Sequence, residues 1–185
     1  MVTTSETTKI LTQPKIQDLP QPSFKRWLKH FCFLPATKRY FDRQDQHAIT
    51  QAVTRAEQGH IGEIQVVIEG HIPAHQAYSQ NTYARAQQLF AELGVWDTEH
   101  NSGVLLYLNL CERSVEIVID RGIKKLTEQQ VWQRICESML IALKQGQYRD
   151  AVVNGVLEIG SVLGKFYDDV TLDEKNEISD LPVIL

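Results

Sequence analysis

The sequence of 185 residues has few features that mark a specialised class of protein. Its three cysteines, Cys32, Cys111 and Cys136, are widely spaced and form no CxxC pair, so we expect reduced thiols rather than a disulfide framework or a zinc cage. No apolar run approaches the roughly 20 residues that span a bilayer. The net charge of −4 provides no basic excess, so no nucleic-acid partner is predicted.

The first 22 residues are polar and lack the basic start and apolar run of a secretory signal. We therefore expect a flexible tail at 1–22 and a cytoplasmic protein, with possible peripheral contact to the inner membrane. The composition, 43% hydrophobic and 23% charged, is that of an ordinary globular domain, which we place at 23–168. Residues 169–185 are predicted to be a loose acidic tail, of which only 181–185 is expected to dock on the domain.

An amphipathic helix is predicted at 23–35, with Ser23 as its N-cap and Pro35 as its stop. One face carries the apolar residues Phe24, Trp27, Leu28 and Phe31, and the other carries the basic residues Lys25, Arg26, Lys29 and His30. The favoured interpretation is that the apolar face packs on the domain. The alternative is that Lys25, Arg26 and Lys29 hold the helix on an anionic membrane.

The remaining core, 40–167, has the pattern of an α/β protein. Short β-branched runs predict strands at 62–69, 103–108 and 115–119, and helical periodicity predicts helices at 44–58, 77–93, 128–144 and 147–167, with a loop at 71–76. A strand–helix–strand unit makes the first two strands parallel. The tight turn at 111–113 makes the third strand antiparallel to the second. Gly160 and Gly164 are expected to allow close helix packing.

This topology brings polar side chains to the sheet edge where the two parallel strands start. The candidates there are Glu57, His60, Glu63, Asp97, Glu99, His100, Asn101 and Asp120. The carboxylates of such a cluster repel one another unless a cation neutralises them. One possible cation is Ca²⁺ or Mg²⁺, which prefer oxygen ligands. The other is the side chain of Arg121. The predicted metal ligands are Glu63, Asp97, Glu99, Asn101 and Asp120. No catalytic residue is assigned, and no organic cofactor is predicted.

Four segments resemble the TPM domain family in its short bacterial branch. They are His60-Ile-Gly-Glu-Ile64, Trp96-Asp-Thr-Glu-His-Asn-Ser-Gly-Val-Leu105, Arg113-Ser-Val-Glu-Ile-Val-Ile-Asp-Arg-Gly-Ile123 and Gly146-Gln-Tyr148, within a resemblance that covers 40–167. The resemblance implies a three-layer α/β/α sandwich around a small mixed sheet. The family includes thylakoid-lumen proteins of photosystem II repair with a proposed acid phosphatase activity, bacterial proteins that bind divalent metal at an acidic site, and a nematode receptor accessory protein.

Three functions follow from the residues and the resemblance together. The first is a binding or maintenance module that acts at the inner face of the cell membrane in stress or envelope maintenance, with a protein partner that the sequence does not identify. The second is a metal-assisted phosphatase in which Asp97, Glu99 and Asp120 hold a cation that activates water. The third is a structural domain whose acidic edge docks a protein.

Overall fold

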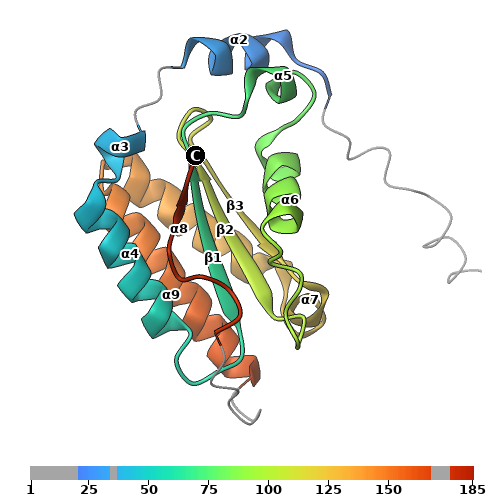
Figure 1. The fold of residues 1–185 in the computed structure, drawn as a ribbon, viewed down its shortest axis with the longest axis vertical. Helices are drawn as coiled ribbons and strands as arrows, with labels where there is room; N and C mark the ends of the chain where they lie inside the picture. The colour runs from blue at the N-terminus through green and yellow to red at the C-terminus, as the bar shows by residue number, and fades with distance from the viewer. Residues whose placement is uncertain (1–20, 34–36, 168–175) are drawn as a thin grey trace, which may run out of the picture.

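A computed structural model describes residues 21–33, 37–167 and 176–185 and has the expected three-layer α/β/α architecture (Figure 1). Its mixed sheet contains β1 (Glu63–Glu69), β2 (Gly103–Asn109), β3 (Ser114–Ile119) and β4 (Val183–Ile184) in the order β3-β2-β1-β4. β1 and β2 are parallel, with Glu63 opposite Gly103, and β3 is antiparallel to β2. Both pairings were predicted from the strand–helix–strand unit and the tight turn, and both are confirmed.

Alternation along β1 divides the core between the two faces of the sheet. Ile64, Val66 and Ile68 pack against one helical layer, formed by α4 (Arg43–Ala56), α8 (Gln129–Lys144) and α9 (Tyr148–Tyr167). Val67 faces the opposite layer, which contains α6 (Thr82–Glu92). Figure 1 shows these layers on the two sides of the sheet. Because both faces are covered, all residues of β1 and β2 are buried.

Local signals explain where the helices of the larger layer begin and end. Asp42 and Asp45 form a capping box at the start of α4, since each side chain accepts from the backbone N–H of the other. Between α8 and α9, Gly146 adopts a positive φ of 80°, a conformation that glycine takes without steric cost. The predicted helices at 44–58, 128–144 and 147–167 therefore agree with the structure to within about two residues, the usual uncertainty of helix ends.

The helix predicted at 77–93 is wrong in its first part. Two helices occupy the region, α5 (Ala74–Ala77) and α6, and α5 lies mostly within the predicted loop. The side chain of Asn81 accepts the N–H of Ala84 and begins α6 as an N-cap, which separates it from α5. The short helix α3 (Thr37–Tyr40) was not predicted, whereas α7 (Arg121–Leu126) begins after Asp120, which the sequence offered as the cap of a turn or helix at Arg121-Gly122.

The C-terminal segment adds a parallel strand to the outer side of β1. Leu185 donates its N–H to the carbonyl of Ile68 at 2.9 Å, and its own carbonyl accepts the N–H of Gly70 at 2.9 Å. The last residues, predicted to dock within an otherwise loose tail, thus complete the sheet. Of the predicted tails, residues 1–20 and 169–175 lie outside the described residues.

Helix α2 (Phe24–Cys32) begins at Ser23 as predicted, but the favoured interpretation of its faces is wrong. The apolar side chains of Phe24, Leu28 and Phe31 are exposed, and the single buried side chain of the helix is that of His30. The polar face therefore lies on the domain. Pro35 lies outside the described residues. Among the residues that the structure describes, no helix combines the length and the apolar character needed to cross a membrane.

Candidate functional site

The predicted acidic edge lies where β1 and β2 start and β3 ends. Glu63 donates its N–H to the carbonyl of Ser102, and Asp120 donates its N–H to the carbonyl of Gly103. These two backbone contacts bring Glu63 and Asp120 to the same end of the sheet, as the topology requires. The residues of the edge differ, however, in burial and in their partners.

Glu63 is buried and Glu57 is half-buried at this edge, and the C-terminal segment lies beside both. The carboxylate of Glu63 accepts the N–H groups of Glu177 and Ile178, both at 3.4 Å, and burial raises its pKa. Glu57 accepts the N–H of Ile64 at 2.7 Å, and burial raises its pKa to about 9. The negative charges of Glu63 and Asp180 also raise the pKa of Glu57. Glu57 is therefore protonated at neutral pH.

The loop before β2 directs its acidic side chains outward. Asp97 and Glu99 are exposed, whereas Thr98 between them is buried and accepts the N–H of Ser102 at 2.8 Å. This hydrogen bond closes the loop, as turn-forming residues commonly do. The backbone N–H of Glu99 contacts the carboxylate of Glu177. The side chains of Asp97 and Glu99, two of the predicted metal ligands, are therefore exposed to solvent.

Asp120 combines a structural role with an oxygen that has no partner. Its Oδ1 accepts the N–H of Arg121 and caps α7, while Oδ2 is buried without a hydrogen bond. The side chain of Arg121, predicted as a competing neutraliser, donates instead to Oδ1 of Asn101 at 3.0 Å. Asn101 itself has a positive φ of 53°. Asp120 thus has one buried side-chain oxygen without a hydrogen bond.

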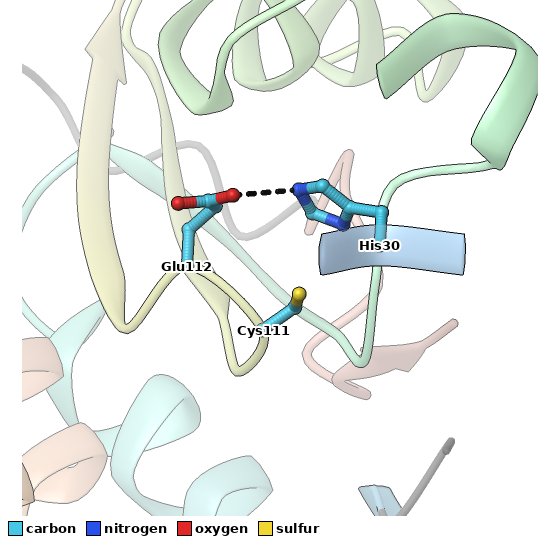
Figure 2. A group of neighbouring side chains, drawn as sticks. All are labelled: His30, Cys111 and Glu112. Carbon is cyan, nitrogen blue, oxygen red and sulfur yellow. Dashed lines mark ion pairs between the residues drawn. The ribbon is translucent and has the colours of Figure 1, made fainter. Parts of the chain in front are cut away.

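In the described part of the chain, the acidic edge holds no group of three His, Cys, Asp or Glu ligand atoms within 4.8 Å. Such a group occurs at the opposite end of β2, where His30, Cys111 and Glu112 meet (Figure 2). Binding of Ca²⁺ or Mg²⁺ by Glu63, Asp97, Glu99, Asn101 and Asp120 remains a prediction.

A buried ion pair lies between β1 and α6, and sequence reasoning missed it. Arg85 donates to both carboxylate oxygens of Glu69, with the shortest contact at 2.8 Å, and Tyr107 donates its hydroxyl to the same carboxylate. Asn109 donates to the Tyr107 hydroxyl at 2.8 Å and accepts the N–H of Glu112. The sequence did contain a signal. Arg85 lies four residues before Leu89, which places its charged side chain on the buried face of the predicted helix. This chain of contacts leads from the ion pair to the β2–β3 turn.

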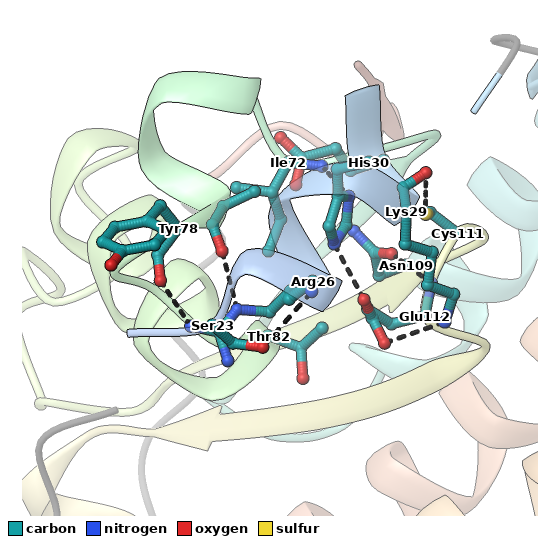
Figure 3. A network of polar contacts seen from close by, with 12 residues as sticks. Ser23, Arg26, Lys29, His30, Ile72, Tyr78, Thr82, Asn109, Cys111 and Glu112 are labelled. Atoms are coloured by element: carbon teal, nitrogen blue, oxygen red, sulfur yellow. Dashed lines mark hydrogen bonds and ion pairs between the residues drawn. The ribbon is translucent and has the colours of Figure 1, made fainter. Parts of the chain in front are cut away.

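The polar face of α2 is fixed on that turn and on the α5 region (Figure 3). Arg26 donates to the carbonyls of Ala77 and Tyr78, at 2.7 and 2.9 Å. Lys29 pairs with Oε2 of Glu112 at 2.9 Å. Nε2 of His30 lies 3.0 Å from Oε1 of the same carboxylate. The residues predicted to attract a membrane therefore include two, Arg26 and Lys29, that already have partners within the domain.

The protonation of His30 follows from its second nitrogen. Nδ1 accepts the N–H of Ile72 at 3.0 Å, so the neutral ring carries its proton on Nε2. Burial lowers the pKa of His30, and the carboxylate of Glu112 opposes this effect. Nε2 and Oε1 lie 3.0 Å apart and form an ion pair when the imidazole is protonated. The thiol of Cys111 lies beside them, 3.7 Å from the carbonyl of Lys29, and burial raises its pKa to about 11.

Comparisons with known proteins agree with this fold. The model of the TPM domain matches residues 36–162, more than half of the chain. The BA42 protein of the psychrophilic bacterium Bizionia argentinensis is 24% identical, with a TM-score of 0.68 over 78% of this chain and 94% of that protein. The N-terminal domain of a P. gingivalis protein is 18% identical, with a TM-score of 0.60 over 85% and 96% of the two chains. No curated protein matches the chain.

Proposed function

The chain belongs to the TPM domain family, and we propose that it serves as a binding module that attaches to a lipid surface through the apolar face of α2. The observation that carries this proposal is the orientation of the helix, whose polar face contacts the domain and whose apolar face points outward. A cytoplasmic location at the inner membrane, and a role in stress or envelope maintenance, are parts of the same proposal.

The outward face of α2 is a continuous apolar surface. Phe24 and Phe31 are 65% and 64% exposed and Leu28 is 45% exposed. The ring of Trp27 stacks between the two phenylalanine rings, with centroids 5.2 Å apart on each side. Contiguous exposed apolar patches on soluble domains mark sites of interaction, and aromatic residues on one helix face suit the interface of a bilayer. We call these four residues the α2 stripe.

The α2 stripe changes the kind of membrane contact that we expect. Arg26 donates to carbonyls and Lys29 pairs with Glu112, whereas Lys25, the third member of the predicted trio, is exposed. Attraction to anionic lipid through Lys25 alone is weak, at about 1 kcal/mol. Binding should therefore depend on apolar insertion and respond only modestly to lipid charge and to salt.

Vesicle flotation of the full chain tests this function. The variant Phe24→Ser/Phe31→Ser removes the two outer rings of the α2 stripe. Tyr83→Ser/Trp96→Ser is the matched control, since it removes two aromatic side chains of similar exposure from another surface. We expect the wild type and the control to float with phosphatidylcholine vesicles and with vesicles that also contain phosphatidylglycerol, and the α2 variant to stay in solution.

Two results would overturn the proposal. One is a wild type that stays in solution with both vesicle types. The other is a pair of double variants that float equally well. If the wild type stays in solution but forms dimers by sedimentation that Phe24→Ser/Phe31→Ser abolishes, the α2 stripe covers a second copy of the chain instead of a lipid surface.

A second candidate function, a metal-assisted phosphatase, is favoured by the unpartnered buried oxygen of Asp120. A divalent cation held there with Asp97 and Glu99 would polarise a phosphoryl oxygen and activate water. The oxygen donors suit Ca²⁺ or Mg²⁺. Because Asp97 and Glu99 are exposed, the loop would have to turn them inward on binding.

Calorimetric titration with Ca²⁺ and Mg²⁺ separates the remaining possibilities. Saturable binding that is lost in Asp97→Asn and in Asp120→Asn, with phosphate-ester hydrolysis that increases with metal and disappears in Asp120→Asn, would support the phosphatase. Absence of binding by the wild type would exclude it. In that case, a pull-down whose partner is lost on charge reversal of the same edge would identify a protein-docking surface.

A further inference from the structure

We infer that His30, Cys111 and Glu112 form a binding site for Zn²⁺ that joins α2 to the β2–β3 turn. The three side chains come from two elements that are distant in sequence, and Figure 2 shows them facing one another. Each offers one ligand atom, and these atoms lie within 4.8 Å of one another. The site is separate from the acidic edge, which lies at the other end of β2.

The donor set selects the metal. One imidazole nitrogen, one sulfur and one carboxylate oxygen form a mixed set that Ca²⁺ and Mg²⁺ do not favour, because these ions take oxygen ligands. Zn²⁺ accepts all three donor types and is commonly four-coordinate. A neutral imidazole, a thiolate and a carboxylate also balance the two positive charges of the ion. Water would supply the fourth ligand.

The His30–Glu112 contact places two potential ligand atoms side by side. Nε2 and Oε1 are buried and 3.0 Å apart, where they form an ion pair in the metal-free chain. In a tetrahedral zinc site, neighbouring ligand atoms lie about 3.3 to 3.6 Å apart, and neither lies along the bonding direction of the other. Binding would require the Cys111 and Glu112 side chains to move until all three ligand atoms reach these distances.

Neighbouring residues already orient the two ligands of the β2–β3 turn. Lys29 holds Oε2 of Glu112 at 2.9 Å and leaves Oε1 facing His30. The N–H of Cys111 donates to the carbonyl of Gly70, and the N–H of Glu112 donates to the side chain of Asn109 (Figure 3). Such outer contacts fix the position of a ligand before the ion arrives. The β2–β3 turn therefore presents both of its ligands from a fixed backbone.

Zinc binding has one defined structural consequence. When Nε2 binds the ion, the ring proton must lie on Nδ1, and Nδ1 then cannot accept the N–H of Ile72 as it does in the metal-free chain. The ion and this hydrogen bond exclude each other. The Ile72 amide is therefore an internal reporter of occupancy, and its nuclear magnetic resonance signal should shift when zinc binds.

The test uses the full chain with Zn²⁺ and with Co²⁺, a spectroscopic substitute. We expect one Zn²⁺ per chain in competition with a chromogenic chelator, a thiolate-to-cobalt charge-transfer band, and a shift of the Ile72 amide signal. Cys111→Ser should abolish the band and weaken zinc binding at least about 100-fold, more than is typical for loss of an outer contact. Cys32→Ser is the matched control, because it removes an exposed thiol from α2, the helix that carries His30, and it should behave as wild type.

Asp120→Asn separates this site from the acidic edge and should also bind Zn²⁺ as wild type does. The inference is overturned if the wild type binds no stoichiometric zinc, or if the cobalt complex lacks the thiolate band. It is equally overturned if Cys111→Ser retains wild-type affinity or if the band depends on Cys32. If Cys111→Ser folds poorly, the shift of the Ile72 amide in the wild type still tests whether the ion binds at His30.

Discussion

Gly160 of α9 lies directly against Ala56 of α4, so closely that a Cβ at Gly160 would come within 2.6 Å of the Ala56 carbonyl oxygen. The obstacle is backbone, which has little freedom to move aside. Gly164, one turn later, meets only the edge of the His60 ring at 3.5 Å, an ordinary contact distance. The two glycines therefore differ in what a methyl group would do.

We expect Gly160→Ala to reduce the free energy of unfolding by about 1 to 3 kcal/mol, because overpacking at the α4–α9 contact outweighs the gain in helix propensity. Gly164→Ala is the matched control and should be neutral or stabilising by up to about 1 kcal/mol. Urea unfolding measures both variants. Equal losses in the two variants would contradict the proposed close contact.

The Arg85–Glu69 pair provides a second prediction. Both side chains are buried, so Arg85→Met leaves an unpaired carboxylate in the core and should cost about 3 to 5 kcal/mol of stability. Adding Glu69→Gln removes that charge, keeps an acceptor for Tyr107, and should restore more than half of the loss. Arg149→Ala breaks an exposed pair with Asp150 and should cost less than about 1 kcal/mol. Thermal unfolding of the wild type and these three variants checks this order, which a double variant no more stable than Arg85→Met would contradict.

Glu57 provides a prediction for pH dependence. Burial raises its pKa from 4.5 to about 9, so the folded chain retains a proton that the unfolded chain releases between these values. The contribution of this group to stability is complete below pH 4.5 and is lost as the pH rises toward 9. Glu57→Gln removes the titration and keeps an oxygen for the N–H of Ile64.

Stability of Glu57→Gln should therefore fall less than that of the wild type between about pH 5 and about pH 9, by at most about 1.4 kcal/mol per pH unit. Denaturant unfolding across this range measures the difference. Glu158→Gln, on the exposed side of α9, should follow the wild type. Parallel profiles for the wild type and Glu57→Gln would rule out a raised pKa at this position.

Asp120 permits its capping role to be separated from cation binding. Asparagine caps helices as well as aspartate does, so Asp120→Asn should change stability by less than about 0.5 kcal/mol, whereas Asp120→Ala should lose about 1 kcal/mol. Thermal unfolding without metal measures both. A large loss in Asp120→Asn would show that the carboxylate itself stabilises the fold, and the variant would then be unsuitable for the metal titrations.

Strong local patterns in the sequence predicted most of the fold. The β-branched runs that form β1 and β2 and the glycine between α8 and α9 identify their elements without knowledge of the partners. β4 is different, because Val183 and Ile184 are too few to form a pattern and only the exposed edge of β1 makes them a strand. The predicted helix over α5 and α6 was too long because Asn81 was not recognised as an N-cap.

The candidate sites depended more strongly on distant residues. Periodicity predicted α2 but not which face it buries, because that choice rests on contacts of His30 with Ile72 and Glu112, 42 and 82 positions away in sequence. The burial of Glu57 and Glu63 likewise depends on the return of the C-terminal segment. A pattern of charges shows which side chains are available, whereas their neighbours decide which of them are buried.

The reversed orientation of α2 has a consequence for how the molecule opens. Hydrogen bonds and ion pairs attach this helix to the domain, and detaching it would uncover little apolar surface, since its apolar residues already face outward. Local unfolding needs the least free energy where few apolar contacts are lost. Amide hydrogens of α2 should therefore exchange with solvent before those of β1 and β2. The exchange would occur by local detachment of the helix, while the sheet remains folded.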